Sequence, residues 1–270
     1  MNDIIRKFES DIIKKYRKDI WSKFIKAIKK YNLVEEGDRI AIAMSGGKDS
    51  LLLAKLFQEL MKHPHMKFEI EFISMDPGFS KDNLDMHFEN AEKLGVPLNI
   101  ECSNIFKIVE KISNDYPCYM CARMRRGFLY NMAKESGCNK LALGHHFDDV
   151  IETSLMNMFY AGTIRTMLPK LPSENFEGLE LIRPMYMIKE KSIIALMKSN
   201  NIITMDCGCE INVCSTSSKR SEVKNLIKQL KRTSEDVDKN IFRALENIDL
   251  DGVVSYTQNK KRMNRYDEKE

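Results

Sequence analysis

Short apolar segments alternate with longer amphipathic segments between residues 39 and 160. Four segments have the composition of strands, namely residues 39–44, 69–75, 97–102 and 140–143. Each precedes apolar residues at helical spacing, over 51–61, 83–94, 105–112 and 149–160. Strands that alternate with such helices form βαβ units and a parallel sheet. The sequence therefore predicts a doubly wound α/β fold, with ligands in one cleft beyond the strand ends at Met44, Met75, Cys102 and Leu143.

Three further regions surround this core. Residues 1–36 contain a basic amphipathic helix to about residue 31, which packs on the core and could also present its basic face to nucleic acid. The α/β domain is expected to span 37–204, with an inserted Cys-x-x-Cys pair and, at 169–184, a surface loop that leads into one short strand. Residues 205–258 combine a cysteine group with helices to about residue 247, and 259–270 form a polar, frayed tail.

Composition excludes several classes of protein. The chain has 270 residues, a formal charge of +4, 43% hydrophobic and 30% charged residues. It has no apolar run near the ~20 residues that a membrane span requires, and its N-terminus lacks the apolar centre of a secretion signal. We therefore expect a cytoplasmic protein that does not associate with membranes. In that reducing compartment, an odd number of cysteines, seven, indicates a metal or sulfur site rather than a disulfide framework.

A glycine-rich loop, Ser45-Gly46-Gly47-Lys48-Asp49-Ser50, follows the first predicted strand and opens a helix. Backbone N–H groups and the positive end of a helix bind phosphate in this setting, and the glycines let the backbone approach closely. The loop is not a Walker A motif, which would need glycine at Ile42 and a hydroxyl residue at Asp49. A plain Gly-Gly turn with a capping serine would account for the glycines but not for all six residues.

A second turn, Gly144-His145-His146-Phe147-Asp148-Asp149, closes the last predicted strand. Two adjacent carboxylates beside a phosphate site suit Mg²⁺, which prefers oxygen ligands and substrate phosphates. One of the aspartates could instead cap the following helix. The two histidines could be packing residues, and we assign neither as a base.

The cysteines form two groups. Cys118 and Cys121 make a Cys-x-x-Cys pair, which alone could be a redox pair, half of a zinc site or a pair of cluster ligands. The second group, later in the chain, consists of Cys207, Cys209 and Cys214. Two near cysteines and one distant cysteine can close a tetrahedral sulfur site. The remaining two, Cys102 and Cys138, lie in apolar surroundings and are expected to be buried.

The six-residue loop resembles the PP-loop of ATP pyrophosphatases, which cleave ATP between its α and β phosphates and adenylate a substrate oxygen. Over about residues 30–230 the chain resembles, more narrowly, the tRNA 2-thiocytidine synthetase family. The further segments that carry this resemblance are Asn32–Arg39, Pro77–Phe79, Cys118–Gly127, Gly144–Thr153, Asn157–Tyr160 and Arg183–Pro184. In that family the C2 oxygen of anticodon-loop cytidine 32 is adenylated and then replaced by sulfur, which arrives through a 4Fe-4S cluster held by three cysteines.

This resemblance implies roles for individual residues. Cys118 and Cys121 match two cluster ligands, and Cys214 best matches the third, although Cys207 or Cys209 could serve instead or carry a persulfide. The implied catalytic residues are Asp49, Arg125 and Asp149, with Mg²⁺ on Asp49 or Asp149. The implied ATP contacts are Ser45, Gly46, Gly47, Lys48, Asp49, Ser50, Met75, Gly144, His145 and Asp148. Arg125, with its neighbours Arg123 and Arg126, could equally bind tRNA phosphates.

Basic residues are unevenly distributed along the chain. Residues 1–31 carry ten Lys and Arg against four Asp and Glu, and 219–232 form a second basic stretch. We expect these stretches to bind tRNA with the target base turned out into the cleft, although solvated helix faces would look the same. The family also implies a sulfide or persulfide donor and a homodimer. Three other functions remain open, namely thiolation of a tRNA uridine, a zinc-containing PP-loop enzyme that does not thiolate, and an RNA adaptor that binds nucleotide without turnover.

Overall fold

The computed structural model describes residues 2–63, 66–112, 117–204, 215–258 and 261–264. The chain divides into two compact units, Met1–Val223 and Lys224–Glu270. No helix in the described ranges is both long enough and apolar enough to cross a membrane.

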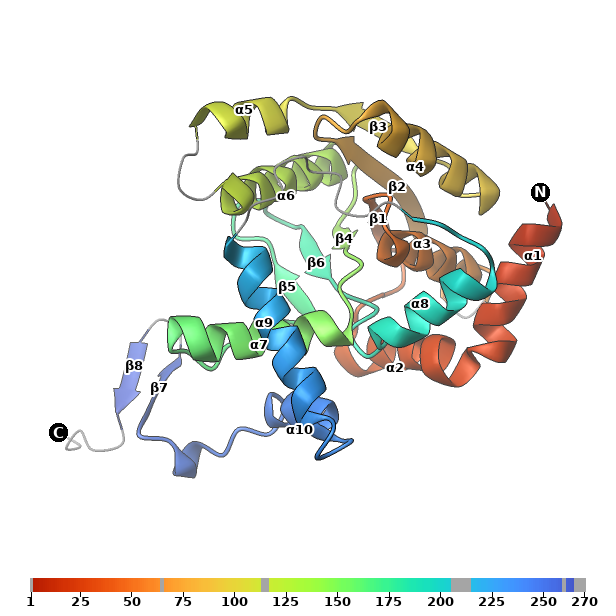
Figure 1. Ribbon diagram of the computed structural model, residues 1–270. Coiled ribbons are helices and arrows are strands. Elements are labelled where there is room, and N and C mark those ends of the chain that lie inside the picture. Colours follow the sequence, from red (N-terminus) through yellow and green to blue (C-terminus); the bar gives the residue numbers. More distant parts are fainter. Residues whose placement is uncertain (1, 64–65, 113–116, 205–214, 259–260, 265–270) are drawn as a thin grey trace. The chain divides into compact units, whose positions relative to one another are not determined.

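The first unit is built on a six-stranded sheet with the order β3-β2-β1-β4-β6-β5 (Figure 1). Its strands are β1 Arg39–Met44, β2 Glu69–Asp76, β3 Asn99–Cys102, β4 Lys140–Ala142, β5 Lys170–Pro172 and β6 Glu180–Ile182. All neighbouring pairs are parallel except β5 and β6. In the centre, Ile42 of β1 pairs with Phe72 of β2 on one side and Ala142 of β4 on the other. The predicted α/β fold is therefore confirmed, and the turns after β1 and β4 lie at the same edge of the sheet.

The connecting helices are α3 Lys48–Met61, α4 Lys81–Lys93, α5 Ile105–Ile112, α6 Pro117–Glu135, α7 Phe147–Ala161 and α8 Glu190–Ser199. Four of these, α3, α4, α5 and α7, match the predicted helices to within three residues. The segment predicted as a loop with one strand instead contains two, β5 and β6, joined as an antiparallel pair. Each is only three residues long, which is too short for the alternation of apolar and polar residues to identify a strand.

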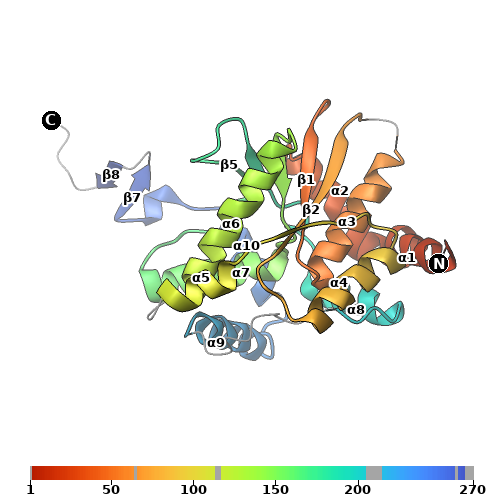
Figure 2. The same ribbon diagram turned by 90° about the horizontal axis from the view of Figure 1, so that it is seen from above.

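Two apolar clusters lie on opposite faces of this sheet. Ile40 and Ile42 of β1 pack with α3, α8 and the N-terminal helices, whereas Ala41 and Ala43 pack with α5 and α6. Figure 2 shows α3 and α6 on either side of β1. Cys138 is buried in the second cluster, as predicted. Cys102 is exposed, so the prediction of burial was wrong for it, because it ends the edge strand β3.

The N-terminal segment is part of the core. It comprises α1 Asn2–Ser10, two short π-helical turns at Asp11–Lys15 and Arg17–Trp21, and α2 Ser22–Tyr31. Phe8, Ile12, Ile20 and Phe24 have no exposed surface and join the cluster of α3. Its lysines lie mainly on the exposed side. This segment is therefore a core-packed helical layer with a basic outer face, and its apolar face is not available to a partner.

The C-terminal part of the chain begins with α9, Ser215–Leu230, which crosses the boundary between the two units. The second unit continues with α10 Val237–Ala244, a 3-10 turn at Leu250–Gly252, and strands β7 Ser255–Gln258 and β8 Lys261–Asn264. The two strands pair with each other in antiparallel fashion. Residues 261–264 therefore form a strand where the sequence predicted part of a polar tail.

Candidate active site

The glycine-rich loop is held in shape by its own serines. The Ser45 N–H donates to Ser50 Oγ at 3.2 Å, and Ser50 Oγ donates to the Gly47 carbonyl at 2.9 Å. Gly46 has a φ of 78°, a left-handed conformation that glycine adopts without strain. Gly47 then caps α3, and its own φ is in the extended region. The first N–H groups of α3 therefore form a preorganised anion site at the end of β1.

The second turn caps α7 and packs against this loop. His146 accepts the Asp149 N–H at its Nδ1 atom, at 3.4 Å, and Asp149 Oδ2 accepts the His146 N–H at 3.0 Å. This reciprocal arrangement is a capping box. His146 Nε2 also lies 3.8 Å from Asp49 Oδ1, on the other turn. One histidine therefore joins the two turns, and it acts as a helix cap in the free protein.

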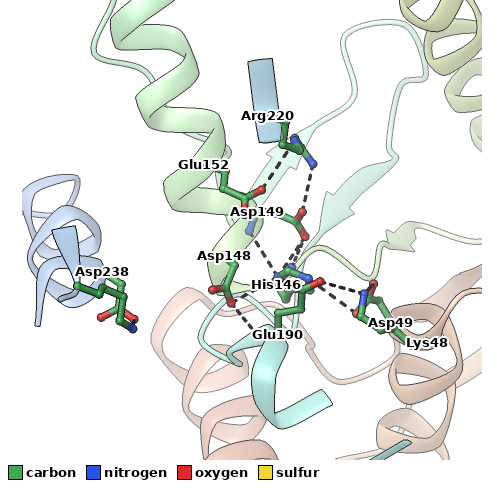
Figure 3. A network of polar contacts seen from close by, with 10 residues as sticks. Lys48, Asp49, His146, Asp148, Asp149, Glu152, Glu190, Arg220 and Asp238 are labelled. Atoms are coloured by element: carbon green, nitrogen blue, oxygen red, sulfur yellow. Dashed lines mark hydrogen bonds and ion pairs between the residues drawn. The ribbon is translucent and has the colours of Figure 1, made fainter. Parts of the chain in front are cut away.

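Carboxylates and cations form a connected network around these turns (Figure 3). The Lys48 ammonium lies 3.1 Å from Asp49 and 3.3 Å from Glu190, the first residue of α8. Asp148 Oδ2 accepts the Glu190 N–H at 2.7 Å. Sequence reasoning missed Glu190, because an acidic residue at the start of a helix is common and belongs to no motif here.

Burial and neighbouring charges shift the pKa values of several groups at this site. It raises the pKa of the Asp49 carboxyl above its ordinary value, although His146 and Lys48 oppose the effect. For the Lys48 ammonium, burial lowers the pKa, but Asp49 and Glu190 outweigh it, so that the pKa lies above its usual value. Burial and the Arg183 guanidinium lower the pKa of His145 to about 4, so its imidazole is neutral at pH 7.

One oxygen of Asp49 has no hydrogen-bond partner among the described residues, although it is buried. A buried carboxylate oxygen of this kind suits a cation that arrives with a ligand. Within the described ranges, no group of three or more His, Cys, Asp or Glu side chains is arranged to hold a metal ion alone. A cation at Asp49 would therefore take further ligands from phosphate oxygens and water.

A cavity of about 390 Å³ opens beside the two turns. Its walls include Ser45, Asp49 and Ser50 from the first turn, together with Gly144, His145 and Asp149 from the second. The opposite wall comes from α6 through Ala122, Arg125, Arg126 and Leu129. Half-buried Cys121 precedes Ala122 on that helix. The structure thus places Arg125 and the helix of the Cys-x-x-Cys pair at the phosphate-binding turns.

Other predicted site residues lie elsewhere or outside the description. Met75 does not line this cavity; its side chain is buried and packs in the cluster with α5 and α6. Of the four strand ends expected to share one cleft, those of β1 and β4 contribute to the cavity. The side chain of Cys118 is not among those described, although its backbone belongs to α6. Cys207, Cys209 and Cys214 fall in 205–214, outside the described residues.

Comparisons with known proteins agree with this geometry. The PP-loop domain family matches residues 17–206. The tRNA-cytidine(32) 2-sulfurtransferase of Syntrophotalea carbinolica is 38% identical over 226 residues, which are 83% of this chain and 86% of that protein. The enzyme of that name from Geotalea uraniireducens is 39% identical over 239 residues, 86% of this chain and 93% of its own. The chain belongs to the tRNA-cytidine(32) 2-sulfurtransferase family.

The solved structures show the same fold for this member of the tRNA-cytidine(32) 2-sulfurtransferase family. The U34-tRNA thiolase NcsA from Methanococcus maripaludis, determined with its [4Fe-4S] cluster, matches with a TM-score of 0.65. The match covers 92% of this chain and 82% of that one at 24% sequence identity. This match confirms the fold alone, whereas the family model confirms the PP-loop resemblance and the sequence relatives confirm the narrower family.

Proposed function

We propose that this protein is an ATP-dependent tRNA sulfurtransferase that replaces the C2 oxygen of cytidine 32 with sulfur. The observation that carries the proposal is the cavity in which Asp49 and Asp149 of the two phosphate-side turns face Arg125 of α6. The relatives named for this reaction are 34–39% identical over most of their length. The cavity is large enough for a pyrimidine base beside a phosphate group.

The first half of the reaction needs the nucleotide loop. The C2 oxygen of the base attacks the α phosphorus of ATP, forms a P–O bond and releases pyrophosphate with Mg²⁺. The N-terminus of α3 and the Lys48 ammonium stabilise the charge of the departing pyrophosphate. The buried Oδ1 atom of Asp49, which has no hydrogen-bond partner among the described residues, would serve as a ligand for Mg²⁺.

The second half replaces the activated oxygen. A sulfur nucleophile forms a bond to C2, the C2–O bond breaks, and AMP carries away the oxygen. Arg125, on the cavity wall, would offset negative charge on the leaving phosphate, and Asp149 would hold or accept a proton near the base. Adenylation is needed because a pyrimidine carbonyl oxygen is otherwise a poor leaving group.

Cys118, Cys121 and Cys214 would hold a 4Fe-4S cluster, which would supply the incoming sulfide when bound. The fit rests on Cys121, a half-buried thiol on the helix that forms the cavity wall. A cysteine thiolate on such a wall is chemically suited to iron–sulfur ligation. We also propose that sulfide or a persulfide donates the sulfur, that the protein is a homodimer and that it is located in the cytoplasm.

The substrate itself would be held through its backbone and its target loop. Exposed lysines on the N-terminal segment would contact tRNA phosphates, and cytidine 32 would leave its stack to enter the cavity. Arg126, which also lines the cavity, is available to the phosphate that follows the target base.

The test is reconstitution with protein purified without oxygen. Unmodified tRNA, ATP, Mg²⁺ and sulfide should give 2-thiocytidine at position 32 and one pyrophosphate for each base modified. Asp149→Asn should abolish formation of 2-thiocytidine, whereas Asp85→Asn, on the exposed side of α4, should leave both products unchanged. Colourless, zinc-loaded protein would favour a non-thiolating enzyme, thiouridine would indicate the other base, and ATP binding without pyrophosphate release would indicate an RNA adaptor.

A further inference from the structure

Arg220 reaches from α9 to the catalytic side of α7 (Figure 3). Its Nη1 atom lies 3.3 Å from Asp149 Oδ1, and its Nη2 donates to Thr153 Oγ1 at 3.4 Å. Its Nε atom is 3.9 Å from Glu152 Oε2. One guanidinium group therefore contacts three residues on the same face of α7, the helix that begins at the cavity.

The contact fixes the orientation of Asp149. Asp149 Oδ2 already accepts the His146 N–H in the capping box, at 3.0 Å. Because Arg220 binds the other oxygen, Oδ1, both oxygens of this carboxylate are held, one by the turn after β4 and one by α9. A carboxylate with two fixed oxygens has little freedom to rotate, which is the property that a group acting at a reacting base requires.

The arginine also compensates a buried charge. The Glu152 side chain is only 6% exposed, and that of Asp149 is 18% exposed, so neither carboxylate is well solvated. A planar guanidinium can serve both at once through separate N–H groups, whereas a lysine ammonium is a single point charge. The residue type at position 220 thus matches a bridging role.

The neighbouring residue on α9 provides a contrast. Lys219 carries the same charge, but its ammonium lies over the Tyr160 ring, 4.9 Å from the ring centre. In the sequence both residues belong to one basic stretch expected to bind RNA. Of these two residues, Arg220 alone contacts Asp149, a carboxylate that lines the cavity, so the two residues have different roles.

We infer that Arg220 is a positioning residue that holds Asp149 for the reaction and links α9 to the nucleotide site. This inference rests on the proposed function. α9 begins at Ser215, directly after the segment that contains Cys207, Cys209 and Cys214. The segment that carries these cysteines therefore continues directly into α9, and Arg220, the sixth residue of that helix, contacts the Asp149 carboxylate.

The experiment compares Arg220→Lys and Arg220→Ala with Lys219→Ala in the reconstituted assay, with kcat and the KM for tRNA measured separately. A positioning role predicts that both Arg220 variants lower kcat by about 10- to 100-fold, while the KM for tRNA changes less than about twofold. Arg220→Lys keeps the charge near Glu152 and is expected to fold, so it decides the matter even if Arg220→Ala is unstable. Lys219→Ala should keep kcat within about twofold.

An RNA-binding role gives the opposite pattern. The inference is overturned if Arg220→Lys has the kcat of the unaltered protein, or if Arg220→Ala raises the KM for tRNA with kcat unchanged. If the unaltered protein makes no 2-thiocytidine, the proposed function fails; if it does and the Arg220 variants match it, only this inference fails.

Discussion

Gly144 approaches Asp49 so closely that a Cβ atom on Gly144 would lie 3.2 Å from the Asp49 carbonyl carbon and 3.3 Å from its Cβ. The turn after β4 and the first turn of α3 are therefore in close contact, and a methyl group on Gly144 would fit only if Asp49 shifted by a few tenths of an ångström. This contact sets the distance between the loop that binds phosphate and the turn that carries Asp149. Glycine is needed here for close approach, since its φ is not in the left-handed region.

Gly144→Ala should push the two turns apart. We expect a loss of about 1–3 kcal/mol in the free energy of unfolding, as for other overpacked sites, and roughly a tenfold loss of tRNA-dependent pyrophosphate release. Denaturant unfolding and a pyrophosphate assay measure the two effects. The matched control is Gly127→Ala in α6, where a Cβ meets nothing within 4 Å. It should be neutral or stabilising by about 0.5–1 kcal/mol, and equal losses in both variants would contradict the account.

Asp49→Asn should make the protein more stable and less active. Because burial raises the folded-state pKa of Asp49 above its ordinary 3.8, the protonated form is favoured on folding. The protonated Asp49 carboxyl group therefore contributes to the stability of the folded protein below pH 3.8, and this contribution is lost as the pH rises through the folded-state pKa. The variant should therefore unfold at a higher temperature than the unaltered protein at pH 7, and this advantage should shrink toward pH 4. Its pyrophosphate release should fall by about 100-fold or more.

The pH dependence and a control variant both test this explanation. A stabilisation of Asp49→Asn that is as large at pH 4 as at pH 7 would mean that the charge is not its cause. Asp85→Asn provides the control for a general loss of negative charge, because Asp85 is exposed on α4, and it should change stability by less than about 0.5 kcal/mol.

Glu9→Gln should loosen the N-terminal segment. The Lys55 ammonium is 2.8 Å from Glu9 and its side chain is only 1% exposed, so loss of the carboxylate leaves a buried charge without its counterion. We expect a loss of about 2–3 kcal/mol, somewhat below the range for fully buried pairs because the Glu9 side chain is 18% exposed. Adding Lys55→Met should restore most of this loss.

An exposed ion pair on α4 provides the control for the buried pair of Lys55 and Glu9. Lys93 and Glu89 are 3.7 Å apart with side chains 52% and 66% exposed. Glu89→Gln should therefore cost less than about 0.5 kcal/mol. Urea unfolding of these three variants and the unaltered protein measures the difference, and equal costs for Glu9→Gln and Glu89→Gln would show that burial of Lys55 does not matter.

Lys18→Glu should weaken tRNA binding without changing ATP binding. Lys18 is exposed on the N-terminal segment, whose apolar side chains are buried, so a substitution tests the basic face without unfolding the core. Loss of one phosphate contact should raise the Kd for tRNA roughly threefold to fivefold and reduce its salt dependence. Fluorescence titration at several salt concentrations measures both. The same change at Lys93, exposed on α4, is the control, and equal effects of the two substitutions would argue against a local RNA contact.

The sequence was a good guide wherever a signal is contiguous. β1 was predicted with its exact ends, because an apolar run is bounded by Arg39 and by the serine-glycine loop. The site residues on the two turns were likewise predictable, since each turn is a short motif at the end of a strand. Arg125, which family resemblance alone suggested, lines the same cavity, and its catalytic role stays a prediction.

Contacts between distant segments could not be read in this way. Lys55 and Lys140 are buried, at 1% exposure each, because each meets carboxylates from other parts of the chain, and charge patterns place such residues at the surface. Arg220 looked like one of several basic residues on an RNA-binding helix. Its role depends on the packing of α9 against α7, which no local pattern in the sequence encodes.

We expect cytidine 32 of tRNA to be thiolated in the cavity between the PP-loop and α6. Mass spectrometry of tRNA nucleosides from a strain that lacks this protein tests it most directly. We expect 2-thiocytidine to disappear while the other thionucleosides stay at their normal levels. The gene for the unaltered protein should restore it, and the gene for Asp149→Asn should not. Unchanged 2-thiocytidine, or the loss of a thiouridine in its place, would contradict the account.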